Sequence, residues 1–273
     1  MPELPEVETV RGGLERLMGD DAVIARVELR RRDLRRIIPP SLPRQLAGQR
    51  VIAVRRRAKY LLFDTPAVTL LCHLGMTGSW RLAPPGDERP HDHCYLHLAD
   101  GRRLAFRDPR RFGLLDLIKP GQEQLHPALA DLGPEPLDSA AFHAGHLVAA
   151  CRGRRGAIKP LIMDQRVVVG IGNIYAQEAL FRARIHPARS AGRIPVTALT
   201  SLVEHLRAIL NEAIAAGGST ISDFRQAGGS EGHFQTRFQI YGRSEKPCVI
   251  CGARLRGGVI GGRGTTWCPR CQR

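Results

Sequence analysis

The sequence has few aromatic residues, few lysines and no long apolar run, and each shortage limits what the protein can be. Of its 273 residues, 43% are hydrophobic but only 5% are aromatic, so a sizeable core must be built mainly from aliphatic side chains. Apolar runs such as 167–169 fall far short of the roughly 20 residues that cross a bilayer, which excludes a spanning helix. The acidic start is unlike a secretory signal. We therefore expect a cytoplasmic protein.

Acidic residues are also scarce relative to basic ones. The 41 Lys and Arg against 26 Asp and Glu give a net charge of +15, and only four of the cations are lysines. The sequence pI is near 10.5. Such a balance is expected of a protein that binds a polyanion, most commonly nucleic acid. A generically basic protein is the alternative interpretation.

Disulfides are not expected in a reducing compartment, so the seven cysteines need another explanation. Three of them (Cys72, Cys94 and Cys151) are scattered and are expected to be small buried hydrophobes. The other four form two Cys-x-x-Cys pairs, a spacing typical of a tetrahedral zinc site with no open position. Glycine pairs between these two motifs predict a β-hairpin that carries Arg254, Arg256 and Arg263. The ligands of this structural Zn²⁺ are Cys248, Cys251, Cys268 and Cys271.

The first eight residues, Met1-Pro2-Glu3-Leu4-Pro5-Glu6-Val7-Glu8, allow two interpretations. Met1 precedes a small residue and is expected to be removed, which would leave Pro2 with a free secondary amine. An α-amino group has a pKa of about 7.7–8.0, against about 10.4 for lysine, so a useful fraction is neutral and nucleophilic at physiological pH. The alternative is an ordinary helix start, since proline and acidic residues suit a first turn.

The chain is expected to change character near residue 133. Upstream, helical spacing of apolar residues over 4–19 is followed by short strand-like runs separated by turns, which indicates an antiparallel sandwich or barrel. Downstream, the periodicity is helical, and residues 227–232 are expected to form a mobile loop. The predicted domains are 1–133, 134–238 and 239–273. The predicted strands are 22–29, 51–54, 60–63, 68–74, 94–98, 104–107 and 114–118, and the predicted helices after them are 140–151, 159–164, 172–184 and 196–216.

Three further patterns point to a polyanionic partner. The glycine-rich turn 169–175 opens a helix and could clamp a phosphate, with a plain turn as the equal alternative. The basic clusters 55–60 and 107–113 each include an aromatic residue, which favours backbone contacts together with a side chain able to wedge into a base stack. Of the histidines at 91, 93 and 97, we expect phosphate contact or a structural role, because no third metal ligand is evident nearby.

With these residues laid out, the chain resembles the bacterial formamidopyrimidine-DNA glycosylases, the bifunctional enzymes that excise oxidised purines. The match runs essentially from end to end and includes the N-terminal Pro2-Glu3-Leu4-Pro5-Glu6-Val7-Glu8-Thr9 and the C-terminal cysteine hairpin. Between them lie Arg56-Arg57-Ala58-Lys59-Tyr60-Leu61-Leu62, His73-Leu74-Gly75-Met76-Thr77-Gly78, His91-Asp92-His93, Asp108-Pro109-Arg110-Arg111-Phe112-Gly113, Leu132-Gly133-Pro134-Glu135-Pro136-Leu137, Ala157-Ile158-Lys159-Pro160 and Gly170-Ile171-Gly172-Asn173-Ile174-Tyr175-Ala176.

The resemblance implies an α+β protein: a helix-fronted antiparallel β-sandwich, then a helical helix–two-turn–helix domain with a β-hairpin zinc finger. It implies a monomer that binds damaged double-stranded DNA with one structural Zn²⁺ and no organic cofactor, in a bacterial cytoplasm at the nucleoid. Excision would pass through a Pro2 Schiff base, followed by β,δ-elimination at the abasic site.

The resemblance also assigns roles residue by residue. The nucleophile is Pro2, Glu3 is the acid that assists ring opening, and Lys59 serves the lyase steps. Arg263 matches the finger arginine that grips a phosphate near the lesion. The positions that match DNA contacts are His91, Arg110, Arg154, Lys159 and Asn173, and those that match the trio filling the gap of the everted base are Met76, Arg110 and Phe112.

Two departures from the family pattern stand out, one bearing on lesion preference and loop order and the other, a smaller matter, on phosphate binding. Residues 231–234 read Glu-Gly-His-Phe where relatives often carry Pro-Gly-Tyr-Phe, so His233 bears on the lesion preference. Arg154 stands where lysine is common. Two alternatives stay open: the related endonuclease VIII type, which prefers oxidised pyrimidines, and a DNA-binding zinc-finger protein without activity. Leu4 and the gap-filling trio favour the purine enzyme, and the presence of Pro2, Glu3 and Lys59 together disfavours the inactive scaffold.

Overall fold

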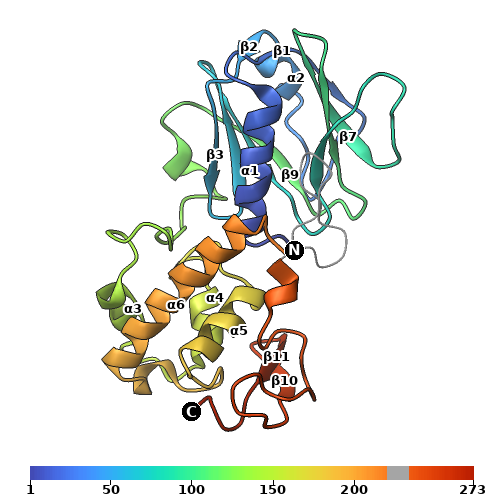
Figure 1. Cartoon of the computed structure of the whole chain (residues 1–273). Helices are drawn as coiled ribbons and strands as arrows, with labels where there is room; N and C mark the ends of the chain where they lie inside the picture. The colour runs from blue at the N-terminus through green and yellow to red at the C-terminus, as the bar shows by residue number, and fades with distance from the viewer. Residues whose placement is uncertain (220–233) are drawn as a thin grey trace. The chain divides into compact units, whose positions relative to one another are not determined.

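The structure is a computed structural model that describes residues 1–219 and 234–273. The expected mobile loop at 227–232 and His233 therefore lie outside the described residues. The chain divides into two compact units (Figure 1), Met1–Ala130 with Ala216–His233 and Asp131–Ala215 with Phe234–Arg273. The first break thus lies close to the boundary expected at 133, but the cysteine finger shares a unit with the helices.

The first unit is a β-sandwich with a helix at its N-terminus. One sheet has the strand order β2-β1-β7-β8-β6, the other has the order β3-β4-β5-β9, and every pairing is antiparallel. The elements are α1 (Leu4–Met18), β1 (Val23–Leu29), α2 (Leu42–Leu46), β2 (Gln49–Arg50), β3 (Ala53–Arg57), β4 (Tyr60–Asp64), β5 (Thr69–His73), β6 (Ser79–Leu82), β7 (Asp92–Leu98), β8 (Arg103–Arg107), β9 (Leu114–Ile118) and the 3-10 turn η1 (Glu123–Leu125).

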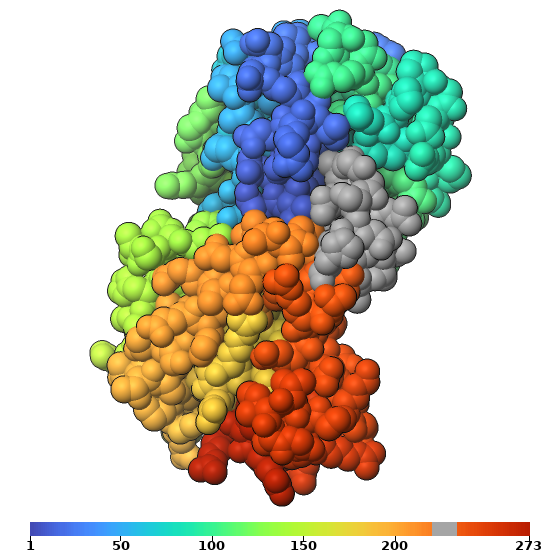
Figure 2. Space-filling model, in the orientation of Figure 1, coloured from blue at the N-terminus to red at the C-terminus, as the bar shows by residue number. Residues whose placement is uncertain are grey.

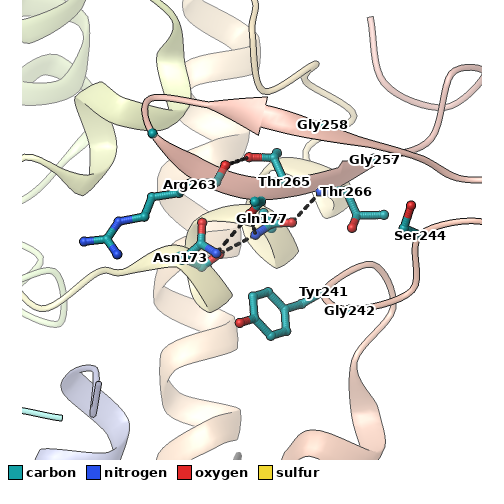
Figure 3. A pocket seen from close by; sticks show the side chains of 12 residues that line it. Asn173, Gln177, Tyr241, Gly242, Ser244, Gly257, Gly258, Arg263, Thr265 and Thr266 are labelled. Atoms are coloured by element: carbon teal, nitrogen blue, oxygen red, sulfur yellow. Dashed lines mark hydrogen bonds between the residues drawn. The ribbon is translucent and has the colours of Figure 1, made fainter.

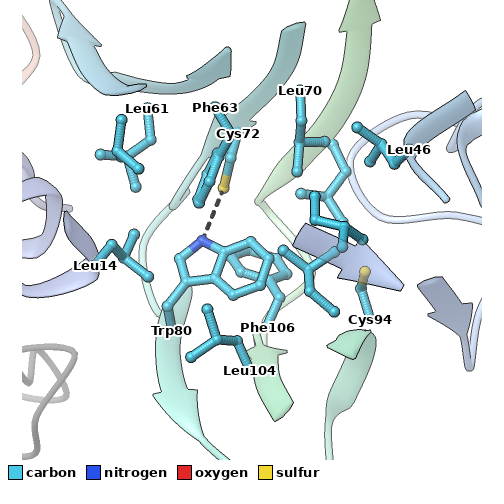
Figure 4. Packing of buried hydrophobic residues seen from close by; sticks show 14 of the residues in the cluster. Leu14, Leu46, Leu61, Phe63, Leu70, Cys72, Trp80, Cys94, Leu104 and Phe106 are labelled. Atoms are coloured by element: carbon cyan, nitrogen blue, oxygen red, sulfur yellow. Dashed lines mark hydrogen bonds between the residues drawn. The ribbon is translucent and has the colours of Figure 1, made fainter. Parts of the chain in front are cut away.

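The sandwich core forms around Trp80 of β6, which lies between the two sheets (Figure 4). Its ring centroid is 5.5 Å from that of Phe63 in the opposite sheet and 5.2 Å from that of Phe106 in its own. The indole N–H donates to Cys72 Sγ at 3.4 Å. Cys72 and Cys94 are fully enclosed, and burial raises the pKa of the Cys72 thiol to about 12. Both are therefore inert packing residues, as the sequence predicts.

Helix α1 packs its apolar stripe into this core. Val7, Val10 and Leu14 repeat at helical spacing and are each at most 1% exposed. The helix begins with a capping box in which Glu3 and Glu6 exchange side-chain and backbone bonds. The outer face of α1 is visible as a dark blue band on the first unit (Figure 2). The ordinary helix start expected from the sequence is confirmed.

The second unit consists of helices and the finger hairpin. Its elements are α3 (Ala144–Cys151), α4 (Ile158–Met163), α5 (Asn173–Arg182), α6 (Val196–Ala215), β10 (Arg256–Ile260), β11 (Arg263–Trp267) and the 3-10 turns η2 (Ala191–Arg193) and η3 (Phe234–Arg237). Phe181 of α5 packs with Leu255, Cys248 and Cys268 in one apolar cluster. This cluster ties the finger to the helices, and Figure 2 shows the yellow α5 beside the orange-red finger residues.

Most predicted elements are confirmed within a few residues. The strand expected at 51–54 is instead Ala53–Arg57, and the strands β2 and β6 and the short helix α2 were not predicted. These three elements are too short to show a clear hydrophobic period.

Candidate functional site

The N-terminal end of α1 is held by buried carboxylates. Pro2 is buried, and Glu3 and Glu6 are 3% and 2% exposed. The Glu3 backbone N–H donates to Glu6 Oε2 at 2.9 Å. The other oxygen of Glu6, Oε1, accepts from the N–H and the hydroxyl of Ser219, at 2.8 and 2.7 Å. The position of the first residues is therefore set by a local hydrogen bond within the first turn and by two bonds from the distant Ser219.

The N-terminal amine, on Met1 in this chain, lies in a field of mixed charge. Burial is the main cause that lowers its pKa, and the cations of Lys59 and Arg110 lower it further. The carboxylates of Glu3 and Glu6 oppose this shift. An amine at this end of the chain is thus neutral over a wider pH range than a free α-amine. Glu3, Lys59 and Arg110 are residues that the sequence places in the site, and the charge of each acts on this amine; Glu6 was not among them.

Lys59 lies at the tip of the β3–β4 hairpin. Arg57 pairs with Tyr60, which leaves Ala58 and Lys59 as a two-residue turn. Ala58 adopts a left-handed φ of 53°, and its carbonyl accepts from Arg56 Nη1 at 3.0 Å. Lys59 is 6% exposed. The hairpin therefore positions this amine at the end of a rigid sheet, where its charge reaches the N-terminus.

Two loops of the first unit present exposed side chains that could enter a base stack. Met76 and Phe112 are 40% and 46% exposed. The guanidinium carbon of Arg110 lies 4.9 Å from the centroid of the Phe112 ring. His91, also exposed, has a left-handed φ of 73°. Apolar wedges beside cations suit a surface that separates stacked bases.

The second unit contains an open pocket of about 720 Å³ between α5 and the finger (Figure 3). Asn173, the first residue of α5, donates from Nδ2 to the Gly264 carbonyl at 3.0 Å. Gln177 lies one turn later, directly beneath β11, and bonds to both Gly264 and Thr266. Arg263 lies at the start of β11 and is exposed. The N-terminus of α5 and the side chain of Arg263 thus line the same polar pocket, an arrangement that suits the binding of a phosphate.

Lys159, which matches a DNA-contacting position of the family, is buried in this structure. Its side chain is 0% exposed, and Nζ donates to the Thr265 hydroxyl at 2.7 Å. The Thr265 hydroxyl in turn donates to the Arg263 carbonyl at 2.8 Å. Arg154, in contrast, is exposed. The physical reason is that the hairpin covers Lys159: a Cβ on Gly261 would lie only 2.5 Å from Pro160, so the hairpin turn packs onto the start of α4.

The four finger cysteines form a cluster that fits zinc. Their sulfur atoms all lie within 4.8 Å of one another. The Sγ atoms of Cys248 and Cys271 are 3.9 Å apart, and those of Cys251 and Cys268 are 3.6 Å apart. Tetrahedral bonds of about 2.3 Å place sulfurs about 3.8 Å apart, so the donor set fits one Zn²⁺ with no position left for substrate.

The remaining predicted clusters have structural partners. Arg55 forms ion pairs with Asp64 and Glu123, and Arg56 pairs with Glu8 at 2.9 Å. His93 is buried with Nε2 2.9 Å from the Asp108 carbonyl. These contacts favour the structural role expected for His93, and they show that Arg55 and Arg56 have ion-pair partners within the first unit. Among the described residues, no helix is long and apolar enough to cross a membrane.

The structure also shows residues to which the sequence assigned no role. Asp108 is fully buried and bonds to Thr77 and Gly113 between the two exposed loops. Gln177 bridges α5 and β11. Asp108 lies inside a motif that the sequence singles out, whereas nothing around Gln177 marks it.

Comparison with known proteins gives matches along most of the chain. Three family models match: the formamidopyrimidine-DNA glycosylase N-terminal domain over residues 1–115, the H2TH domain of the same glycosylase over 132–225, and the zinc finger found in FPG and IleRS over 245–273. The formamidopyrimidine-DNA glycosylase of Bdellovibrio bacteriovorus is 53% identical over 274 residues, covering 100% of both chains.

Solved structures agree with this match. The crystal structure of the MutM (Fpg) protein from Thermus thermophilus is 42% identical, with a TM-score of 0.88 over 99% of this chain and 98% of that one. Lactococcus lactis Fpg in complex with DNA containing an abasic site is 35% identical, with a TM-score of 0.90 over 99% of both chains.

Proposed function

The chain belongs to the formamidopyrimidine-DNA glycosylase family, and on that premise we propose that Pro2, Glu3 and Lys59 carry its chemistry. The protein is a base-excision repair enzyme that removes oxidised purines such as 8-oxoguanine from damaged duplex DNA and cleaves the abasic site. The observation that carries the residue assignment is the arrangement at the N-terminus, where buried carboxylates and a lysine surround an amine of lowered pKa.

The chemistry begins once Met1 has been removed and Pro2 carries the free amine. The Pro2 nitrogen attacks C1′ of the damaged nucleotide, and the N-glycosidic bond breaks with its electron pair leaving on the base, which takes up the proton that the Pro2 nitrogen loses. Glu3 protonates the sugar ring oxygen as the ring opens, which gives an iminium between Pro2 and C1′. Glu6 touches no substrate in this scheme. It positions Glu3 through the backbone bond at 2.9 Å.

The iminium then makes strand cleavage possible. It acidifies the C2′ hydrogen, so loss of that proton expels the 3′-phosphate, and a second elimination expels the 5′-phosphate. A base must accept these protons, and Lys59 is suited to the task because the β3–β4 turn presents its amine beside the N-terminus. A one-nucleotide gap remains.

Access to C1′ requires the damaged nucleotide to leave the stack. Eversion costs a few kcal/mol, which inserted side chains offset. Met76 and Phe112 supply apolar surface for the vacated space, and Arg110 supplies a cation stacked on Phe112. His91 contacts the backbone nearby.

The second unit holds the phosphates. Asn173 and Arg263 bind them directly, Arg154 adds an exposed cation, and the bound Zn²⁺ supplies the rigidity of the finger without taking part in the reaction. Lys159 is buried, so its proposed contribution passes through Thr265 to the backbone of Arg263. The enzyme acts as a monomer in the bacterial cytoplasm, where its basic surface keeps it at the nucleoid.

The assignment of Pro2 as the nucleophile is tested by moving the N-terminal amine away from its position. Inserting one alanine between Met1 and Pro2 displaces the terminal amine by about 3.8 Å. We expect borohydride trapping on an 8-oxoguanine duplex to be lost in this variant. In the matched control Pro2→Gly, a terminal amine stays in place and trapping persists. Active protein that retains Met1 would refute the role of Pro2.

The same assay separates the alternative functions. A covalent adduct only on thymine glycol would indicate the pyrimidine-specific type. Binding to the duplex with no adduct on either lesion would indicate a protein without catalysis.

A further inference from the structure

A single buried carboxylate, that of Asp108, lies where three functional loops of the first unit meet. The side chain of Asp108 is 0% exposed. Its Oδ1 accepts the Thr77 hydroxyl at 2.5 Å, and its Oδ2 accepts the Gly113 backbone N–H at 2.7 Å. Thr77 follows Met76, and Gly113 follows Phe112, so the carboxylate binds one residue beside each exposed wedge.

The backbone of Asp108 holds the third loop. Its N–H donates to the carbonyl of His91 at 3.0 Å, which fixes the left-handed turn at that residue. Its carbonyl lies 2.9 Å from His93 Nε2 and accepts from the Arg111 N–H at 3.2 Å. Asp108 therefore has hydrogen bonds on every side and no exposed surface through which it could reach DNA itself.

The hydroxyl of Thr77 extends this network by one residue. It donates to Asp108 and also accepts the backbone N–H of Arg110 at 3.2 Å. One hydroxyl thus joins the loop of Met76 to the loop of Arg110 and Phe112. The loops also touch backbone to backbone, since a Cβ on Gly75 would lie 2.4 Å from the carbonyl carbon of Phe112.

From these contacts we infer that Asp108 and Thr77 are positioning residues that set the gap-filling trio as one rigid wedge. The inference rests on the proposed role of Met76, Arg110 and Phe112. The side chains of the trio must enter the base stack together as the damaged base leaves it. They belong to two loops, and Asp108 and Thr77 fix the position of one loop relative to the other. Without the Thr77 hydroxyl, Arg110 loses a backbone acceptor and Asp108 loses a donor in the same step.

The test compares Thr77→Val with Thr77→Ser. Valine has almost the volume of threonine but no hydroxyl, whereas serine keeps the hydroxyl, so the pair separates the hydrogen bonds from the packing. We expect Thr77→Val to lower the single-turnover rate of 8-oxoguanine excision by about 10-fold or more, because a misplaced wedge raises the barrier to eversion. We expect Thr77→Ser to stay within about twofold of the wild type.

A second measurement distinguishes wedge position from general damage to the fold. Cleavage of a duplex with a ready-made abasic site requires no base to be unstacked, so Thr77→Val should retain it within about threefold. A 2-aminopurine next to the lesion should brighten on mixing with the wild type as the stack opens, and this signal should be reduced in Thr77→Val.

Three results would overturn the inference: excision by Thr77→Val at the wild-type rate, an equal loss in Thr77→Ser, or an equal loss on abasic DNA. The variant Phe112→Ala separates this failure from that of the proposed function. If Phe112→Ala loses excision while Thr77→Val does not, the gap-filling role of Phe112 is supported, and the inference that Thr77 positions the trio is refuted. If the wild type forms no adduct on 8-oxoguanine DNA, the proposed function itself fails.

Discussion

His73 is a neutral imidazole enclosed next to the proposed catalytic lysine. The Gly75 backbone N–H donates to its Nδ1 at 2.9 Å, so the ring carries its proton on Nε2. The Tyr60 ring lies 4.8 Å away between centroids. Burial lowers the pKa of His73 to about 4, and the charges of Lys59 and Arg35 add to the shift. Protonation of Nδ1 would break the bond to Gly75, the residue before Met76.

This histidine makes the stability of the first unit dependent on pH. Its folded-state pKa of about 4 lies below the unfolded value of about 6.5, so the unfolded state binds the proton first as pH falls. The stabilisation is present above pH 6.5 and is lost between 6.5 and 4, by at most about 3 kcal/mol.

We expect His73→Asn to reduce this pH dependence, because asparagine keeps an acceptor for Gly75 but does not titrate. Urea unfolding at pH 7, 5 and 4, followed by Trp80 fluorescence in a Trp267→Phe background, measures the effect. His91→Asn is the matched control: His91 is exposed, and asparagine tolerates its left-handed φ. An equal pH dependence in the wild type and in His73→Asn would contradict the assignment.

Residues of the site differ in how far the sequence alone identifies them. The finger cysteines are marked by residue type and spacing, and Pro2 by its place at the start of the chain. Asp108 stands in a recognisable motif, but its role depends on Thr77, which lies 31 residues away in sequence. A role that arises from tertiary hydrogen bonds has no local pattern, and for this reason Gln177 and Ser219 were not predicted.

At the scale of elements, side chains of helix α5 complete the outer edge of the finger hairpin, and Gln177 makes bonds to two residues of that edge. Gln177 is 2% exposed. Its Oε1 accepts the Thr266 N–H at 2.7 Å, and its Nε2 donates to the Gly264 carbonyl at 3.2 Å. The opposite edge of β11 pairs with β10. The carboxamide thus takes the place of a neighbouring strand and fixes the strand that starts at Arg263.

We expect Gln177→Ala to weaken binding to duplex DNA even though the residue is uncharged and buried. If the hairpin shifts, the phosphate contact proposed for Arg263 is lost, so the slope of log K against log salt should fall by about one, as in Arg263→Ala. Fluorescence anisotropy over a range of salt concentrations measures this slope. Gln45→Ala, which removes an exposed amide from the first unit, is the control. An unchanged slope in Gln177→Ala would show that the hairpin holds its position without this residue.

Two strands that sequence periodicity misplaced or missed, β3 and β6, include arginines whose side chains are largely buried. Strand β3 includes Arg56, whose side chain is only 9% exposed because Glu8 of α1 pairs with it. Strand β6 includes Arg81, which is held by Asp87 and Asp92. When a buried arginine is counted as polar, the alternation of apolar and polar residues that would identify such a strand is interrupted. The helices α1 and α6 have no comparable ion pair on their apolar stripes and were predicted almost to the residue.

At the scale of the molecule, the proposed catalytic residues and the four cysteines that fit zinc lie in different compact units. Pro2, Glu3 and Lys59 belong to the first unit, which has its own core around Trp80. The four finger cysteines belong to the second. The net charge of +15 is spread over both, so each contributes to the electrostatic part of DNA binding. Removal of the metal should therefore affect one unit and leave the fold of the other intact.

The two tryptophans of the chain make this separation measurable. Trp80 lies in the sandwich core, and Trp267 ends β11 with its ring 5.3 Å from that of His186. Trp267→Phe leaves Trp80 as the reporter of the first unit, and Trp80→Phe leaves Trp267 as the reporter of the finger.

We expect a zinc chelator to shift the emission of Trp267 and abolish binding to lesion DNA, because structural zinc contributes folding energy directly. The emission of Trp80 should stay unchanged, and adding Zn²⁺ back should restore both Trp267 emission and binding. A simultaneous change of Trp80 would mean that the units do not fold independently, and DNA affinity unchanged after chelation would exclude the finger as a binding element.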